Sequence, residues 1–569
     1  MIETVAPAAS TETRADRRAI PRSGVARPAA RTPVTRSPVR RGVAGAVLVL
    51  VCLGGVRLLA TPPFLPDDES YHAAYALDVV DGRLPVLRER LVPRLPGQQA
   101  TAYYGANHPP LYYAMTGPVL RAGIESGHAL AGIRLARALT VAMSAGTVVV
   151  VALLAGVVAR RRRAEVMILA AGLTATVPAF VNTSSLIHND ALAVLGSSVA
   201  LLGAALAVKD GVRTVPVALV CSGSAVALAT RFSSVGVVLV AAAGLALACI
   251  IHRVDLTQLR RLVHGVAFGA LPFLCVAATS GWFYLRNRRL YGDFTAVSFK
   301  TEEGGPDTTS LWGYLSSPRN LVDLVIRNEG GGGFRPSPNF DGWNLALLTA
   351  AGGVVALGGA LFLGRLRRWR ASSRGRNGRW GFRLNGASSS RAGLAAAGLI
   401  AGVVLVSWVQ LAGYADQAAS QAGGAYPRYS LGAIPAVAII LACACLGYRG
   451  RLGAVVGVGL IGVQAILAVV SLGNSLDLRL NGSLDRSPLG VLRDAFVDAG
   501  IGAPTVVLGV LSLGVLVGLA LQLSALLTVQ RSSSETARVG DGETAGRSPE
   551  PASLISLSRR VMADRQLLR

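Results

Sequence analysis

The sequence predicts an all-α, polytopic transmembrane helical bundle of about twelve spans, with long extracytoplasmic loops. Of its 569 residues, 52% are hydrophobic and only 15% are charged, and the mean hydropathy is +0.49. A soluble domain carries about 25% charged residues, so the low charged fraction excludes a soluble domain. A disordered chain has a low hydrophobic fraction, so the high hydrophobic fraction excludes a disordered chain. The formal net charge of +25 indicates nucleic acid or membrane as a partner, and the long apolar runs decide for the lipid bilayer and against nucleic acid.

The apolar runs have the length of about 20 residues that a helix needs to cross a bilayer. We expect spans at residues 43–62, 131–158, 164–181, 190–208, 213–230, 233–251, 265–283, 343–364, 392–412, 431–448, 453–472 and 504–527. Residues 43–528 are thus expected to form the transmembrane domain. A basic tail at 1–42 and a polar tail at 529–569 lack apolar periodicity, so we expect the first to be disordered and the second to be mostly so.

Arginine-rich loops set the expected orientation. With twelve spans, Arg160–Arg163, the Lys209–Arg213 turn and the Arg365–Arg383 run all fall on the side of the N-terminus. Because cytoplasmic loops carry an excess of Lys and Arg, we expect a multi-pass protein of the plasma membrane with both termini in the cytoplasm. Residues 110–124 are apolar but short, and a further span there would reverse this pattern, so we interpret them as an interfacial or half-inserted helix.

The first extracytoplasmic loop, expected at 63–130, opens with three carboxylates and a histidine in the run PDDESYH. If a helix starts at Pro66, Asp68 and His72 are four residues apart and share one helix face. This pattern is typical of acid–base chemistry. The alternative is an acidic first turn that is satisfied by the helix dipole and by water.

The same loop closes with NHPPLYY, which begins at Asn107. The two prolines hold Asn107 and His108 in extended geometry, and this would present the His108 ring at the membrane surface. The alternative is a helix start signal followed by aromatic residues of the interfacial belt.

Asp190 begins a later span in the run IHND. In the expected topology this carboxylate lies at the same membrane face as Asp68. The alternative is an N-terminal cap, because Asn or Asp before a helix accepts hydrogen bonds from its free N–H groups.

Several arginines lie outside against the positive-inside trend. Arg286 follows a span at the start of the second long outer loop, expected at 284–342, and Arg428 and Tyr429 precede another span. Arginine binds phosphate through charge-assisted, often bidentate hydrogen bonds, so an anionic phosphate is the ligand we expect. The alternative is contact with lipid head groups.

The span centres hold almost no ionisable residue, whereas ion-coupled carriers place such residues near the membrane midplane. The sequence therefore favours chemistry at the outer rim.

In their order along the chain, these motifs resemble the GT-C type of membrane glycosyltransferase, in the clan of the protein O-mannosyltransferases and the lipid A aminoarabinose transferases. The resemblance covers roughly residues 43–450. It implies that the acidic pair Asp68 and Glu69 is catalytic or binds a metal, with Asp67 as an unresolved competitor for this role, and that His108 lies near a lipid phosphate. The chain departs from relatives with a large soluble C-terminal domain, so its loops would have to recognise the acceptor.

The expected reaction is transfer of a sugar from a polyprenyl-phosphate carrier to a cell-envelope acceptor, which is a glycan, a lipid or a protein. Asp68 would act as general base, and Arg286 and Arg428 would stabilise the leaving phosphate. The remaining candidates for substrate binding are His72, His108, Asp190 and Tyr429. A divalent cation is the one cofactor left open, and its ligands are unknown.

Two other classes stay open: a flippase or another transporter of lipid-linked sugars, and a non-catalytic membrane protein. The second predicts that the outer polar residues do not converge in space. The sequence assigns neither the sugar, the acceptor, the stereochemistry nor the oligomeric state.

Overall fold

The computed structural model describes residues 36–65, 67–159, 161–296, 299, 350–365, 393–407, 409, 431–481 and 486–545. Arg428, Tyr429 and most of the second outer loop expected at 284–342 lie outside these ranges. So do residues 1–35 and 546–569 of the two expected tails.

The described residues form a helical membrane protein, as expected. Seven helices are long and apolar enough to cross a bilayer. They are α1 (Arg36–Ala60), α4 (Ala129–Val158), α7 (Asp190–Asp210), α9 (Val235–His252), α10 (Gln258–Tyr291), α17 (Arg451–Asn481) and α19 (Pro504–Ala545). A bent pair, α5 (Arg163–Ala175) and α6 (Pro178–Ser184), makes an eighth span if its two helices are counted together, and they meet at 63°. Helices dominate because a bilayer offers no hydrogen-bond partner to an exposed peptide group.

The other four expected spans coincide with apolar helices that are shorter than a full crossing. They are α8 (Thr214–Leu228), Ala350–Arg365, Gly393–Ser407 and Leu431–Cys445, which contains α16 (Ile434–Cys445). The polytopic all-α fold class is therefore confirmed. Within the described ranges, length and composition support seven or eight complete spans of the twelve.

Both ends of the described chain are more helical than the expected boundaries. Helix α1 begins at Arg36, seven residues before the expected start of the transmembrane domain, and α19 runs on to Ala545. The segment after the apolar part of α19 is polar, and no proline interrupts it up to Ala545.

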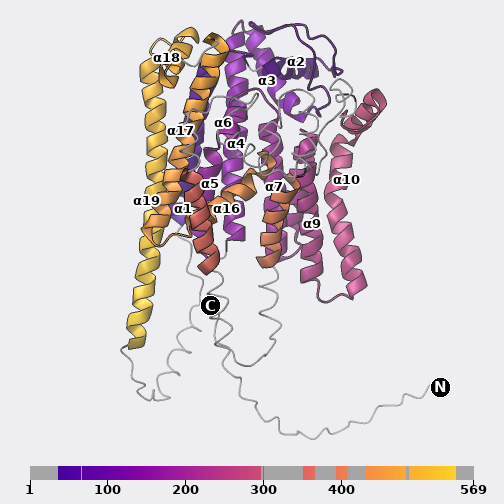
Figure 1. Ribbon diagram of the computed structural model, residues 1–569. Helices are drawn as coiled ribbons and strands as arrows, with labels where there is room; N and C mark the ends of the chain where they lie inside the picture. The colour runs from indigo at the N-terminus through magenta and orange to yellow at the C-terminus, as the bar shows by residue number, and fades with distance from the viewer. Residues whose placement is uncertain are drawn as a thin grey trace, which may run out of the picture. The chain divides into compact units, whose positions relative to one another are not determined.

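Three helices that are not among the membrane-crossing ones gather at one end of the described bundle: α2 (Asp67–Val80), α3 (Leu111–Glu125) and α18 (Pro488–Asp498) (Figure 1). Helix α3 is the short apolar segment of the sequence, and it packs between α2 and α4. Its approach to α2 is close, because a Cβ atom on Gly117 would lie 2.3 Å from the Ala76 carbonyl oxygen.

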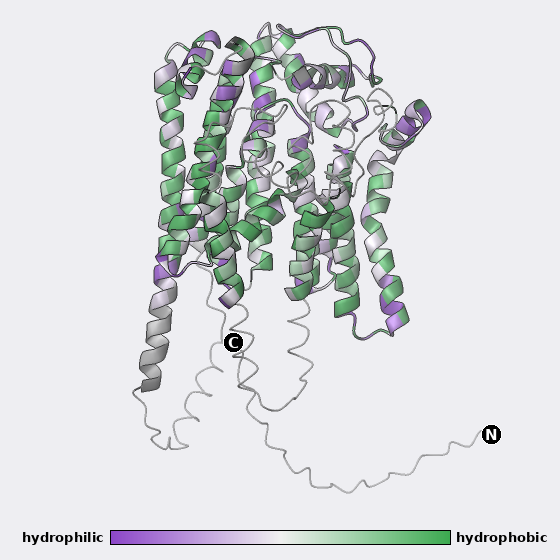
Figure 2. Cartoon of the chain, viewed as in Figure 1, coloured by the Kyte–Doolittle hydropathy of each residue, from purple (hydrophilic) through white to green (hydrophobic). Residues whose placement is uncertain are grey.

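The turns rich in arginine lie at the other end of the helices. There Arg162 donates a hydrogen bond of 3.1 Å to the Leu446 carbonyl, and Gln530 donates one of 3.2 Å to the Gly450 carbonyl. Figure 2 shows hydrophobic residues along the helix shafts and hydrophilic residues toward the helix ends. The bundle thus has one end with basic turns and one end that carries α2, α3 and the acidic motifs.

Candidate functional site

Glu69 is the most enclosed acid of the site. It lies on the first turns of α2 with 1% of its surface exposed. Arg137 on α4 binds it through two hydrogen bonds, from Nε to Oε1 at 2.8 Å and from Nη2 to Oε2 at 2.5 Å. The backbone N–H groups of Phe64 and Ile187 donate to the same carboxylate at 3.1 and 2.9 Å. Four hydrogen bonds therefore close this carboxylate in, which is the arrangement of an anchoring group.

Arg137 uses its remaining donors on the chain that leaves α1. Its Nη1 donates to the carbonyls of Leu58 and Thr61 at 3.1 and 2.7 Å, and its Nη2 donates to the Pro62 carbonyl at 3.1 Å. One buried guanidinium thus joins the end of α1 and the start of α2 to the shaft of α4. We call this arrangement of Glu69 and Arg137 the buried clamp.

The clamp sets the ionisation of Glu69. Burial alone would raise the pKa of this carboxyl, but the charge and hydrogen bonds of Arg137, with the N–H groups of Ile187 and Phe64, outweigh burial and hold the pKa below its ordinary value. The group is therefore an anion at neutral pH, without a proton to give and with its lone pairs occupied.

His72 lies one helical turn after Asp68 on α2 and is also buried. Its Nδ1 is 2.7 Å from the Tyr113 hydroxyl on α3, and the two rings are nearly parallel at 18°. Tyr113 in turn stacks on Tyr75, with ring centroids 4.0 Å apart. Burial raises the pKa of Tyr75, so this phenol stays protonated. Its O–H group donates a hydrogen bond of 2.8 Å to the His108 carbonyl oxygen. A ladder of rings therefore connects His72 to the His108 segment.

Asp190 is the first residue of α7, and it pairs with Arg231, which lies three residues after the end of α8. An ion pair joins Arg231 Nη1 to Asp190 Oδ1, and both side chains are buried. Asp190 Oδ2 lies 3.2 Å from Nδ1 of His188. The Asp190 side chain thus pairs with an arginine and a histidine.

His108 and Arg286 approach the site from two other segments. The His108 side chain is half-buried. Nearby, Asn287 at the end of α10 donates to the Asn107 carbonyl at 3.0 Å, and Asn107 donates to the Thr295 carbonyl at 2.8 Å. The end of α10 and the NHPP segment are thus bound together.

Arg286 Nη2 donates to the carbonyls of Leu84 and Pro85 at 3.1 and 2.9 Å. Its Nη1 is buried and has no hydrogen-bond acceptor among the described residues, and none of their carboxylates pairs with it. This guanidinium therefore keeps a donor for an anion that the described chain does not supply.

The structure brings six of the eight expected site residues to one end of the bundle. They are Asp68, Glu69, His72, His108, Asp190 and Arg286. Asp68 differs from Glu69 and Asp190 in that its side chain is only half-buried. The other two, Arg428 and Tyr429, fall outside the described ranges, and their assignment stays a prediction.

The sequence reasoning missed Arg137, and it missed the pairing of Asp190 with His188 and Arg231. Arg137 had a usable signal, since it is a charge inside the expected span 131–158, and a charge in such a run needs a buried partner. His188 carried no signal of its own beside the Asn and Asp that follow it.

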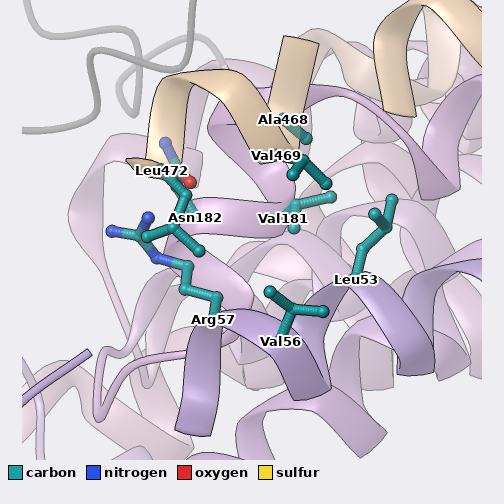
Figure 3. A pocket seen from close by; sticks show the side chains of 8 residues that line it. All are labelled: Leu53, Val56, Arg57, Val181, Asn182, Ala468, Val469 and Leu472. Carbon is teal, nitrogen blue, oxygen red and sulfur yellow. The ribbon is translucent and has the colours of Figure 1, made fainter. Parts of the chain in front are cut away.

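A small cavity of about 10 Å³, room for about one water molecule, lies against the end of α1 (Figure 3). Its apolar wall comes from Leu53, Val56, Val181, Ala468, Val469 and Leu472. Arg57 and Asn182 lie next to each other at one end of it. Because Arg57 directly precedes Leu58, the same helix end forms this cavity and binds Arg137.

No three His, Cys, Asp or Glu side chains gather into a metal-binding group in the part of the chain that the structure describes. His188 and Asp190 meet, but Arg231 occupies the second carboxylate oxygen. These residues therefore do not fit a divalent cation, and no step below depends on one.

Comparison with known proteins gives a likeness of structure only. No protein-family model matches the sequence, and no curated protein matches it. Solved structures similar to the chain include ArnT from Cupriavidus metallidurans bound to undecaprenyl phosphate, with 17% identity over 91% of this chain and 82% of that one, and a TM-score of 0.41. ArnT from the same organism in the apo state has 16% identity over 90% of this chain and 80% of that one, with a TM-score of 0.44.

Proposed function

We propose that the protein is an integral membrane glycosyltransferase that moves a sugar from a polyprenyl-phosphate carrier to a glycan, lipid or protein acceptor on the extracytoplasmic side of the plasma membrane. The observation that carries the proposal is the guanidinium of Arg286. Its buried Nη1 lacks an acceptor among the described residues, and it lies at the same end of the bundle as the half-buried carboxylate of Asp68. A phosphate that leaves a sugar needs such a cation, and an acceptor hydroxyl needs such a base.

The three acids divide their roles by their surroundings. Glu69 and Asp190 are neutralised by Arg137 and Arg231, so they hold segments in place. Asp68 is the acid that an acceptor hydroxyl can reach, because its side chain is only half-buried. It takes the hydroxyl proton while the acceptor oxygen bonds to the anomeric carbon of the sugar.

The bond between that carbon and the phosphate oxygen breaks in the same step, and its electron pair leaves with the polyprenyl phosphate. Arg286 donates hydrogen bonds to the phosphate as its charge rises. The long isoprenoid tail stays in lipid, which is why the site must lie at the end of a membrane bundle and near α3.

The test uses membrane vesicles and a radiolabelled polyprenyl-phosphate sugar, with transfer to endogenous envelope acceptors as the readout. Asp68→Asn removes the base and is expected to lower kcat by about 10²–10⁴-fold. Arg286→Gln is expected to lower both kcat and affinity for the donor. Glu125→Gln and Arg289→Gln are matched controls, because both residues are exposed.

Full transfer activity of Asp68→Asn would refute the catalytic role of this residue. A wild-type protein that moves the lipid-linked sugar across vesicles and transfers none of it would establish the transporter alternative instead. The convergence of the polar residues at one end is the arrangement that the non-catalytic alternative does not predict.

A further inference from the structure

Two buried imidazoles meet between segments that are far apart in the sequence. His72 on α2 and His188 in the turn before α7 have ring centroids 4.4 Å apart, with an edge-to-face angle of 62°. Each side chain has 1% of its surface exposed. The proposed reaction uses neither ring directly. The two rings form a contact between α2 and this turn, in addition to the hydrogen bond from Ile187 to Glu69.

Each imidazole is oriented by a different neighbour. His188 Nδ1 lies 3.2 Å from Asp190 Oδ2, and Arg231 holds the other oxygen of that carboxylate. His72 Nδ1 lies 2.7 Å from the Tyr113 hydroxyl. The chain of contacts therefore runs from an ion pair at the start of α7, through two rings, to α2.

We propose that His188 is a positioning residue, which transmits the fixed orientation of the Asp190–Arg231 ion pair to His72 and so sets the angle at which α2 presents Asp68. This inference rests on the proposed function, in which Asp68 is the base.

The geometry of α2 explains why a second anchor matters. The clamp fixes α2 at Glu69, next to Asp68, and hydrogen bonds hold the later turns of the helix at Tyr75 and Asp78. His72 lies between these anchors, one turn after Asp68 and on the same face. Holding His72 fixes the first turn of the helix more closely, and a displacement of about 1 Å at a reacting group can cost about 10²-fold in rate.

The test compares two substitutions of His188. In His188→Asn, the side-chain amide oxygen takes the place of Nδ1 and accepts the hydrogen bond that the Asp190 backbone N–H donates to Nδ1 at 3.3 Å. In His188→Phe, the edge-to-face packing on His72 remains and this hydrogen bond from Asp190 is lost. His128→Phe is the matched control, because His128 is exposed before α4.

In the vesicle assay, His188→Phe is expected to lower kcat by about 10–100-fold and to leave the KM for the lipid-linked donor within about threefold. His188→Asn is expected to recover a large part of that loss. Wild-type kcat in His188→Phe would overturn the proposal. An equal loss in both variants, with a matching rise in KM, would also overturn it, because His188 would then contact substrate.

A second readout does not need transfer activity. The labelling rate of Asp68→Cys with a membrane-impermeant maleimide is measured in three proteins: the single variant, the double variant with His188→Phe and the double variant with His128→Phe. Matching chains without the added cysteine give the background. The labelling rate is expected to change at least threefold with His188→Phe and to stay unchanged with His128→Phe. An unchanged rate with His188→Phe would refute the positioning role. An inactive wild-type protein would refute only the proposed function.

Discussion

Removal of the guanidinium of Arg137 gives the sharpest test of the clamp. In Arg137→Met, Glu69 keeps the hydrogen bonds from the N–H groups of Phe64 and Ile187 but loses two others and its only clamp cation. Three carbonyls at the end of α1 lose a donor as well. Breaking a buried ion pair by removal of one partner costs about 3–5 kcal/mol, because the other charge stays buried.

The matched control is Arg134→Met, one turn earlier on the same helix. Arg134 donates one hydrogen bond of 2.6 Å to the Ala499 carbonyl, and the loss of a single hydrogen bond costs about 1 kcal/mol. The measurement is the rate of thermal unfolding in detergent micelles, followed by tryptophan fluorescence, because large membrane proteins commonly unfold irreversibly.

Addition of Glu69→Gln to Arg137→Met removes the unpaired charge and is expected to restore part of the stability. The non-additivity of the two substitutions measures the coupling within the clamp. An unfolding rate of Arg137→Met no faster than that of Arg134→Met would refute the clamp, and so would strict additivity with Glu69→Gln.

Three further predictions concern the same end of the bundle. The pKa of Glu69 is lowered below its ordinary value of 4.5, so its stabilising contribution is complete above pH 4.5 and is lost as the pH falls below that value through the lowered pKa. Unfolding in acid should therefore accelerate less in Arg137→Met than in the wild type. Gly117→Val should push α3 from α2, because the new Cβ would lie 2.3 Å from the Ala76 carbonyl oxygen, and should lower the yield of folded protein. Tyr113→Phe removes a hydrogen bond of His72 that is worth about 1 kcal/mol, and it should accelerate thermal unfolding in the same fluorescence assay.

The membrane architecture could be read from the sequence because the bilayer imposes a length on each apolar run. The described helices fall on all twelve expected segments. The sequence could not show that α8 and α16 are shorter than a full crossing, because hydropathy marks an apolar run and not the residue at which a helix ends. Nor could it show the 63° break between α5 and α6, although Pro178 marks the place.

Local spacing revealed one half of the site. Asp68 and His72 lie on one turn of α2, as their spacing of four residues predicts. The resemblance paired Asp68 with Glu69 as catalytic acids, and the structure surrounds Glu69 with donors from residues 64, 137 and 187. Such partners are far away in the sequence, and no spacing rule connects them. The same holds for the contact between His72 and His188.

The short helix α6, which follows the bend after α5, sets the distance between that bend and the turn before α7. Its seven residues lead into the turn whose Ile187 N–H meets Glu69 and whose next residue meets His72. One inserted residue would turn everything after it by about 100° around the helix axis. The Ile187 N–H would then no longer point at Glu69, and the His188 ring would no longer point at His72. The length of α6 is therefore fixed by two contacts that its following turn makes with α2.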